Sequence, residues 1–149
     1  MRTASYHPLF IVDDDEDDRY LIDLAFDAIQ WNDHIRILHS GTQLLQCLDA
    51  LPNAFSYPTL ILLDYHMPGM NAAEVLQRLK THETYRSIKV MVYSTEMTDT
   101  ISSQLVQQGA AACFKKVNYG SEAIEFASHL KREALSCQKA LQPSSLICY

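Results

Sequence analysis

The sequence predicts an α/β fold with a mainly parallel β-sheet, and two observations support this prediction. Five short runs suited to strands alternate along the chain with five segments that have helical spacing of apolar residues. Acidic, hydroxyl and lysine side chains come directly after four of the expected strands, where ligands bind in such sheets. With 149 residues, 48% of them apolar, the chain is long enough for one domain with its own core.

The expected strands differ in how deeply they are buried. Leu9–Val12, Thr59–Leu63 and Ile88–Tyr93 are predominantly apolar, which is typical of central strands covered on both faces. His34–His39 alternates apolar and polar residues as a half-exposed strand does, and Ala111–Phe114 is a short last strand. Right-handed crossovers between such strands place helices on both faces of the sheet.

The expected helices are recognised by apolar residues at intervals of three and four. Pro52 ends the second helix and Gly109 ends the fourth. At the start of the first helix, Asp17 or Asp18 is expected to serve as the cap. The apolar positions, helix by helix, are Leu21, Leu24, Ala25 and Ala28; Leu44, Leu45, Leu48 and Leu51; Val75, Leu76 and Leu79; Ile101 and Leu105; and Ala123, Ala127, Leu130 and Ala134.

The composition limits the classes of function. The net charge of −6, from 18 acidic and 12 basic residues, argues against direct binding of nucleic acid, whose phosphates require clustered Lys and Arg. The chain shows no secretory signal and no apolar run long enough to cross a membrane, so a cytoplasmic protein is expected. The cysteines form no C-x-x-C pair and are expected to be reduced and to fill gaps in the core. They are Cys47, Cys113, Cys137 and Cys148.

Four chemically distinctive features follow four of the strands. An acidic run, 13–18, follows the first strand, and Asp64 follows the third. Ser94 and Thr95 follow the fourth strand, and Lys116 lies at the end of the fifth. Taken singly, each feature is more typical of a solvated surface, a helix cap or a turn. Because parallel strands place these positions at one edge of the sheet, we expect them to converge on one pocket.

The chemistry of that pocket follows from crowded carboxylates, which repel one another unless a cation neutralises them. Mg²⁺ prefers oxygen ligands, so Asp14, Asp64 and a loop carbonyl such as that of His66 are expected to bind it. Carboxylates also accept phosphoryl groups, which makes Asp64 the candidate acceptor. Lys116 and the Ser94 hydroxyl are then expected to contact the phosphoryl oxygens.

Four segments carry a resemblance to a known family. They are FIVDD ending at Asp14, LLDYHMPGM around Asp64, VYS ending at Ser94 and GAAACFKK ending at Lys116. In order, residue type and spacing they resemble the receiver domains of two-component response regulators, over nearly the whole chain. The resemblance implies a flavodoxin-like (βα)5 fold, doubly wound, with a parallel five-stranded sheet in the order 2-1-3-4-5. The chain is further similar to stand-alone receivers paired with sensor kinases, including phytochrome-type kinases.

The resemblance also implies a phosphorylation switch and not an enzyme that turns over an external substrate. A sensor histidine kinase or a histidine phosphotransfer protein would phosphorylate Asp64, which would then change contacts with a partner. Receivers also often form homodimers through the fourth and fifth helices. The residues that the resemblance assigns are Asp14, Asp64 and the His66 backbone carbonyl as Mg²⁺ ligands, Asp13 through metal-bound water, and Ser94 and Lys116 as phosphate contacts.

The chain is expected to contain a single receiver domain over residues 1–149. Its core is expected to cover about 7–138, with a C-terminal tail at 139–149. No DNA-binding or catalytic output segment is expected after the fifth helix. The signal would therefore pass to a partner protein or to a second copy of the chain.

Three positions depart from the pattern of the family. Val117 stands where the family usually has a proline after a cis bond. We predict that the Lys116–Val117 bond is trans, since a cis bond before a non-proline residue costs about 3–4 kcal/mol. Cys113 takes the signal-relay position usually held by Tyr or Phe, although Phe114 is adjacent. Ala72 replaces a common glycine, which is expected to stiffen the acceptor loop.

Two other functions are compatible with parts of the sequence. The acidic run at 13–15 has the Asp-x-Asp spacing of phosphatases similar to the haloacid dehalogenase family, with Asp13 as the nucleophile. That family needs a further acidic motif after the lysine strand, where Glu122 and Glu125 follow, and the Asp64 loop would have no role. The second alternative is a receiver-like module that binds proteins without phosphorylation, and the complete acidic set argues against it.

Overall fold

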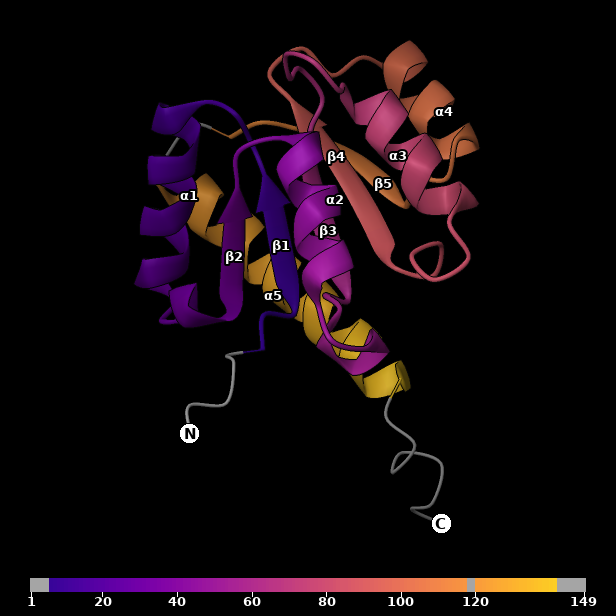
Figure 1. Ribbon diagram of the computed structural model, residues 1–149. Coiled ribbons are helices and arrows are strands. Elements are labelled where there is room, and N and C mark those ends of the chain that lie inside the picture. The colour runs from indigo at the N-terminus through magenta and orange to yellow at the C-terminus, as the bar shows by residue number, and fades with distance from the viewer. Residues whose placement is uncertain (1–5, 118–119, 142–149) are drawn as a thin grey trace.

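The computed structural model describes residues 6–117 and 120–141, and its centre is a five-stranded parallel sheet (Figure 1). The strand order is β2-β1-β3-β4-β5. Both the predicted α/β class and the order implied by the family resemblance are therefore confirmed. The strands are β1 (Leu9–Val12), β2 (Ile35–Leu38), β3 (Leu60–Asp64), β4 (Lys89–Ser94) and β5 (Ala112–Lys115).

The α-helices of the described residues cover both faces of the sheet. α1 and α5 pack on one face, and α2, α3 and α4 pack on the other (Figure 1). Right-handed crossovers between parallel strands produce this arrangement. The helices are α1 (Glu16–Ala28), α2 (Gly41–Ala50), α3 (Ala72–Thr81), α4 (Asp99–Gln107) and α5 (Ser121–Leu141).

The core consists of two apolar layers, one on each face of the sheet. In β3, Ile61 and Leu63 belong to the layer beneath α2, α3 and α4. Leu60 and Leu62 belong to the opposite layer, beneath α1 and α5. All four side chains are fully buried, which explains why this strand is a continuous apolar run and does not alternate with polar residues.

The buried face of α1 differs from the predicted one. Leu24 is 47% exposed and Ala28 is also exposed, whereas Phe26 is 1% exposed. The buried residues of the helix are Ala25 and Phe26, and the Phe26 ring packs on Trp31 with centroids 5.9 Å apart. A large aromatic ring buries more apolar area, so Phe26 faces the core in place of Leu24. In the other helices, the predicted apolar positions that are fully or nearly fully buried are Leu44, Leu48, Val75, Leu76, Leu79, Leu105, Ala127, Leu130 and Ala134.

The ends of the strands and of α1 place polar side chains at the carboxyl edge of the sheet. β3 ends at Asp64 and β4 at Ser94, in each case one residue later than the sequence indicates. The N-cap of α1 is Asp15, whose carboxylate accepts a hydrogen bond from the Asp18 amide at 3.0 Å. The prediction that Asp17 or Asp18 is the cap was therefore wrong. The Asp18 carboxylate instead belongs to the site described below.

The C-terminal helix is longer than predicted. α5 runs to Leu141, so the predicted tail at 139–149 begins as helix, and residues 142–149 lie outside the described residues. Among the helices that the structure describes, none has both the length and the hydropathy needed to cross a membrane.

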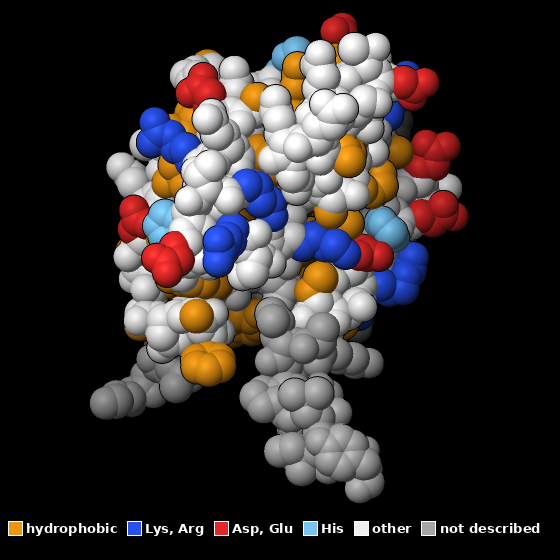
Figure 2. Space-filling view, turned by 90° about the vertical axis from the view of Figure 1, so that its right-hand side faces the viewer, with side chains coloured by type: hydrophobic (Ala, Val, Ile, Leu, Met, Phe, Trp, Pro, Cys, Tyr) orange, Lys and Arg blue, Asp and Glu red, His pale blue; other side chains and the backbone are white. Residues whose placement is uncertain are grey.

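On the face seen in Figure 2, acidic and basic side chains are interspersed, and apolar side chains are scattered between them.

The described cysteines lie at the edge of the core. Cys47, Cys113 and Cys137 are half-buried. Cys47 and Cys113 pack against the layer beneath α2, α3 and α4, so they border the core without lying inside it. Cys148 falls outside the described residues. The prediction that the cysteines fill gaps in the core is therefore only partly right.

Gly41, the first residue of α2, is a point of close packing between α2 and α3. A Cβ atom here would lie 2.5 Å from Cγ2 of Val75, which is fully buried and cannot move aside. Gly41→Ala is therefore expected to lower the free energy of unfolding by about 1–3 kcal/mol in urea denaturation, although alanine favours helix. Thr42→Ala, at the next and exposed position, is the control. A loss at Gly41 no larger than at Thr42 would contradict this prediction.

Candidate functional site

The carboxyl ends of four strands bring the predicted site residues together. Asp13 and Asp14 come directly after β1, and Asp64 is the last residue of β3. Ser94 is the last residue of β4, and Lys116 comes directly after β5. One carboxylate oxygen from each of Asp13, Asp14 and Asp64 lies within 4.8 Å of the others. Asp13 and Asp64 are buried while Asp14 is exposed, so the cluster opens to solvent at Asp14.

Lys116 is the cation of this cluster. Its Nζ lies 3.1 Å from Asp64 Oδ1, 3.1 Å from Asp13 Oδ2 and 2.7 Å from Asp18 Oδ2. It also lies 4.7 Å from the centre of the Tyr93 ring, a cation–π contact. Burial alone would lower the pKa of Lys116, but the neighbouring carboxylates outweigh burial and raise it. The lysine is therefore held in its charged form.

Asp13 is fixed by contacts on both of its carboxylate oxygens. Tyr93 donates a hydrogen bond from its hydroxyl to Oδ2, and the Asp15 amide donates to Oδ1 at 3.0 Å. Burial and the charge of Asp13 raise the pKa of Tyr93 well above its ordinary value, so the hydroxyl stays protonated. Arg19 binds the backbone carbonyl of Asp13 through Nη1 at 3.0 Å. The carboxylate of Asp13 therefore has little freedom to change its position.

The pKa of Asp64 indicates that a charged carboxylate is unfavourable at this position, even with Lys116 beside it. Burial and then the charge of Asp13 raise this pKa from its ordinary value of 3.8 to about 7, although Lys116 acts to lower it. The His66 amide also donates a hydrogen bond to Asp64 Oδ1, at 3.3 Å. A divalent cation in the cluster would stabilise the charged form of this carboxylate.

The donor set fits Mg²⁺. Three carboxylates close to one another supply the hard oxygen ligands that this ion prefers. The exposure of Asp14 leaves room for the water ligands that Mg²⁺ usually keeps. The use of the His66 carbonyl as a further ligand stays a prediction, and the side chain of His66 is exposed.

Ser94, the last residue of β4, is fully buried. Its Oγ accepts a hydrogen bond from the Glu96 amide at 3.2 Å, which leaves the hydroxyl proton for another acceptor. Its carbonyl accepts a hydrogen bond from the Lys116 amide at 2.9 Å. The segments that follow β4 and β5 are therefore joined at this point. Thr95, the next residue, is exposed.

Cys113 and Phe114 belong to opposite layers of the core. Cys113, at the expected signal-relay position, packs against the layer beneath α4. Phe114 packs on α5, with its ring centroid 5.3 Å from Phe126 and 5.7 Å from His129. It therefore cannot replace the aromatic side chain that is missing at Cys113. Tyr93 lies 6.4 Å from Phe126, so a row of rings runs from the pocket to His129.

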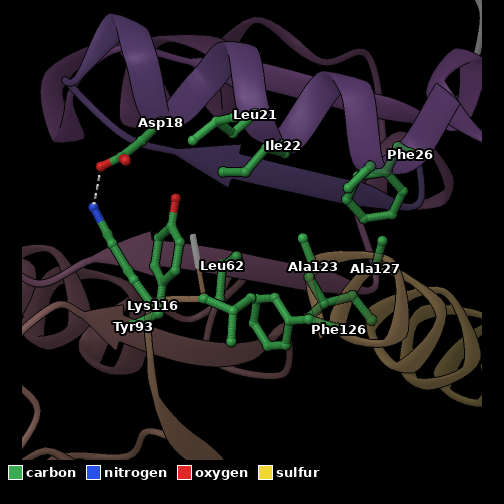
Figure 3. Close-up of a pocket in the computed structure, with 13 residues that line it drawn as sticks. Asp18, Leu21, Ile22, Phe26, Leu62, Tyr93, Lys116, Ala123, Phe126 and Ala127 are labelled. Carbon is green, nitrogen blue, oxygen red and sulfur yellow. Dashed lines mark hydrogen bonds and ion pairs between the residues drawn. The ribbon is translucent and has the colours of Figure 1, made fainter. Parts of the chain in front are cut away.

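The segment after β5 borders a small cavity between α1 and α5 (Figure 3). The Lys116–Val117 bond is trans, as predicted. The cavity has a volume of about 40 Å³, and its walls are mostly apolar side chains, including Leu21, Ile22 and Phe126. Lys116, Tyr93 and Asp18 line the end nearest the acidic cluster.

Two side chains of the site, Asp18 and Tyr93, have no distinct signal in the sequence. Asp18 lies in an acidic run in which each residue is also suited to a helix terminus. Tyr93 directly precedes Ser94, so alternation along β4 places it on the other face of the strand. Its long side chain nevertheless reaches Asp13 with its hydroxyl. The sequence offers only one weak indication of this role, which is that Tyr93 is the direct neighbour of Ser94.

The sequence matches the model of the response regulator receiver domain over residues 9–126. The chain belongs to the response regulator receiver domain family. The two-component response regulator ARR8 of Arabidopsis thaliana is 28% identical to it over 149 aligned residues, which cover 91% of this chain. The receiver chain described here spans 65% of the length of ARR8.

Solved structures of receiver domains have the same fold. The phosphorylated cyanobacterial phytochrome response regulator RcpA aligns with a TM-score of 0.74 and 23% identity, covering 88% of this chain and 95% of RcpA. A two-component response regulator from Legionella pneumophila aligns with a TM-score of 0.69 and 26% identity, covering 85% and 98%. The comparisons therefore favour the receiver over the phosphatase alternative, whose nucleophile, Asp13, is fully buried. Glu122 and Glu125 are both exposed on α5.

Proposed function

We propose that Asp64 accepts a phosphoryl group from a phosphohistidine of a sensor histidine kinase or a histidine phosphotransfer protein. The observation that carries the proposal is the buried Asp64 carboxylate beside the Lys116 ammonium, in a cluster with two further carboxylates. In the transfer, a carboxylate oxygen of Asp64 bonds to phosphorus and the bond between phosphorus and the histidine nitrogen breaks. The electron pair of that bond returns to the imidazole, which takes up a proton from solvent.

The side chains around Asp64 position the reacting groups. Lys116 binds one phosphoryl oxygen through its ammonium, and the Ser94 hydroxyl donates a hydrogen bond to another. Tyr93 keeps Asp13 in place through its hydrogen bond. Bound Mg²⁺ supplies neutralisation of the negative charge on the transferring group. The ligands proposed for it are Asp14, Asp64, the His66 carbonyl and, through metal-bound water, Asp13.

Phosphorylation acts as a switch in this proposal. The domain promotes only its own phosphorylation and dephosphorylation and turns over no external substrate. It acts in the cytoplasm and passes the signal to a partner protein or to a second copy of the chain through α4 and α5. The net charge of −6 supports partners other than nucleic acid.

Incubation with acetyl phosphate and Mg²⁺ is expected to add a phosphoryl group to the protein, detected by intact-protein mass spectrometry. EDTA is expected to prevent the addition, because the crowded carboxylates then lack the divalent cation. Hydroxylamine should remove the group, since it cleaves acyl phosphates and leaves phosphoserine intact. No adduct in the presence of Mg²⁺, or an adduct that survives hydroxylamine, would reject the proposed function.

A further inference from the structure

The ammonium of Lys116 is surrounded by carboxylates, and it donates hydrogen bonds to Asp13 and Asp18. A lysine ammonium has three N–H donors and no acceptor. Three carboxylate oxygens lie within 3.1 Å of Nζ, one each from Asp13, Asp18 and Asp64. A phosphoryl oxygen that approaches Lys116 therefore competes with these carboxylates for its N–H groups.

The three carboxylates differ in how easily they can release the lysine. The side chains of Asp13 and Asp64 are 0% and 5% exposed, so before the transfer either would be left as a buried carboxylate without its cation. The Asp18 side chain is 31% exposed, and water can replace the lysine there. Asp18 is also outside the group of three carboxylates that could hold a metal ion. Of the three partners, Asp18 therefore releases Lys116 at the lowest cost.

The position of Asp18 adds a structural consequence. It lies in the first turn of α1, whereas Lys116 lies after β5, and their contact lies at one end of the cavity between α1 and α5 (Figure 3). The ion pair thus ties the start of α1 to the segment after β5. Its release would remove this direct tie between the two segments.

We propose that Asp18 is a positioning residue that holds Lys116 before phosphorylation and competes with the phosphoryl group for it. The inference rests on the proposed function of Asp64. Phosphorylation then exchanges the Asp18–Lys116 contact for a contact between Lys116 and the phosphoryl group. The first turn of α1 loses its tie to the segment after β5, which gives the signal a route toward α1 in addition to the Cys113 position.

The test compares rates of phosphorylation by acetyl phosphate in Mg²⁺, followed by intact mass. Asp18→Asn and Asp18→Ala are expected to react roughly two- to fivefold faster than the unaltered protein, because a partly exposed ion pair no longer competes for the lysine. Asp17→Asn is the matched control, since it removes the same charge from the same exposed helix turn. Asp18→Glu, which keeps the charge, should restore most of the slow rate.

The outcomes separate this inference from the proposed function. If the unaltered protein takes up no phosphoryl group, the proposed function fails. If it is phosphorylated but the Asp18 variants react no faster than Asp17→Asn, only the role of Asp18 is rejected. Urea denaturation of each variant accompanies the rates, because a purely structural role predicts that the rate falls as the stability falls. A slower reaction of Asp18→Asn at unchanged stability would also overturn the inference.

Discussion

Asp64→Asn is expected to abolish phosphorylation by acetyl phosphate and, in the absence of Mg²⁺, to raise the free energy of unfolding. The amide cannot act as the acceptor, so the phosphoryl adduct should be lost completely. The stability should rise because a neutral amide costs less to bury at this position than a carboxylate and would not be repelled by the charge of Asp13. Mass spectrometry and urea denaturation at neutral pH measure the two effects.

The size of the gain in stability follows from the cost of holding a charged Asp64 carboxylate in a buried position beside Asp13. The pKa of Asp64 is raised from 3.8 to about 7, and one unit corresponds to about 1.4 kcal/mol, so about 4 kcal/mol is an upper bound. Because the neighbouring groups relax, we expect a gain on the order of 2 kcal/mol. Asp23→Asn, an exposed position on α1, is the control for the change in net charge. A phosphoryl adduct on the Asp64→Asn protein, or a loss of stability, would contradict the prediction.

Lys116→Met is expected to have the opposite effect on stability. Without the ammonium, Asp13, Asp18 and Asp64 lose their common cation, and two of these carboxylates are buried. The free energy of unfolding in EDTA should fall by about 3 kcal/mol, and saturating Mg²⁺ should restore much of it. Phosphorylation should slow by a factor on the order of 100, because a charged contact to the phosphoryl group is lost.

The affinity for Mg²⁺ gives a further distinction between the two variants. Lys116→Met should bind the ion more tightly, because the competing positive charge has gone, whereas Asp64→Asn should bind it more weakly. Isothermal titration calorimetry measures both affinities. Lys115→Met removes the same charge from an exposed neighbour and should leave stability and affinity nearly unchanged. Similar behaviour of the Lys115 and Lys116 variants would show that the ion pairs in the pocket are unimportant.

The fold and the main site residues could be predicted because their signals are local. The apolar run before Asp64 indicates a buried strand from its composition alone, and the acid after it marks the end of that strand. The same holds for β1 with Asp13 and for β4 with Ser94. Once these strands are parallel and adjacent, their ends must meet at one edge of the sheet.

The features that could not be predicted depend on contacts between distant positions. The pair of Lys116 and Asp18 joins residues 98 positions apart, and the bond between Tyr93 and Asp13 joins residues 80 positions apart. Neither contact leaves a periodic pattern in the sequence. The inner face of α1 was mispredicted for a related reason, because Leu24 and Phe26 both fit helical spacing and only packing against the neighbouring layer selects Phe26.

A row of rings runs from Tyr93 through Phe126 and Phe114 to His129. Nuclear magnetic resonance can use these rings to observe the interior of the domain in solution. Neighbouring aromatic rings change the NMR chemical shifts of one another through ring currents, and these chemical shifts are sensitive to small changes in ring position. Tyr93, the first ring of the row, is hydrogen-bonded to Asp13 at the acidic pocket, and His129, the last, lies in the middle of α5. The native side chains therefore form a set of spectroscopic reporters that spans the distance from the pocket to a surface helix without any added label.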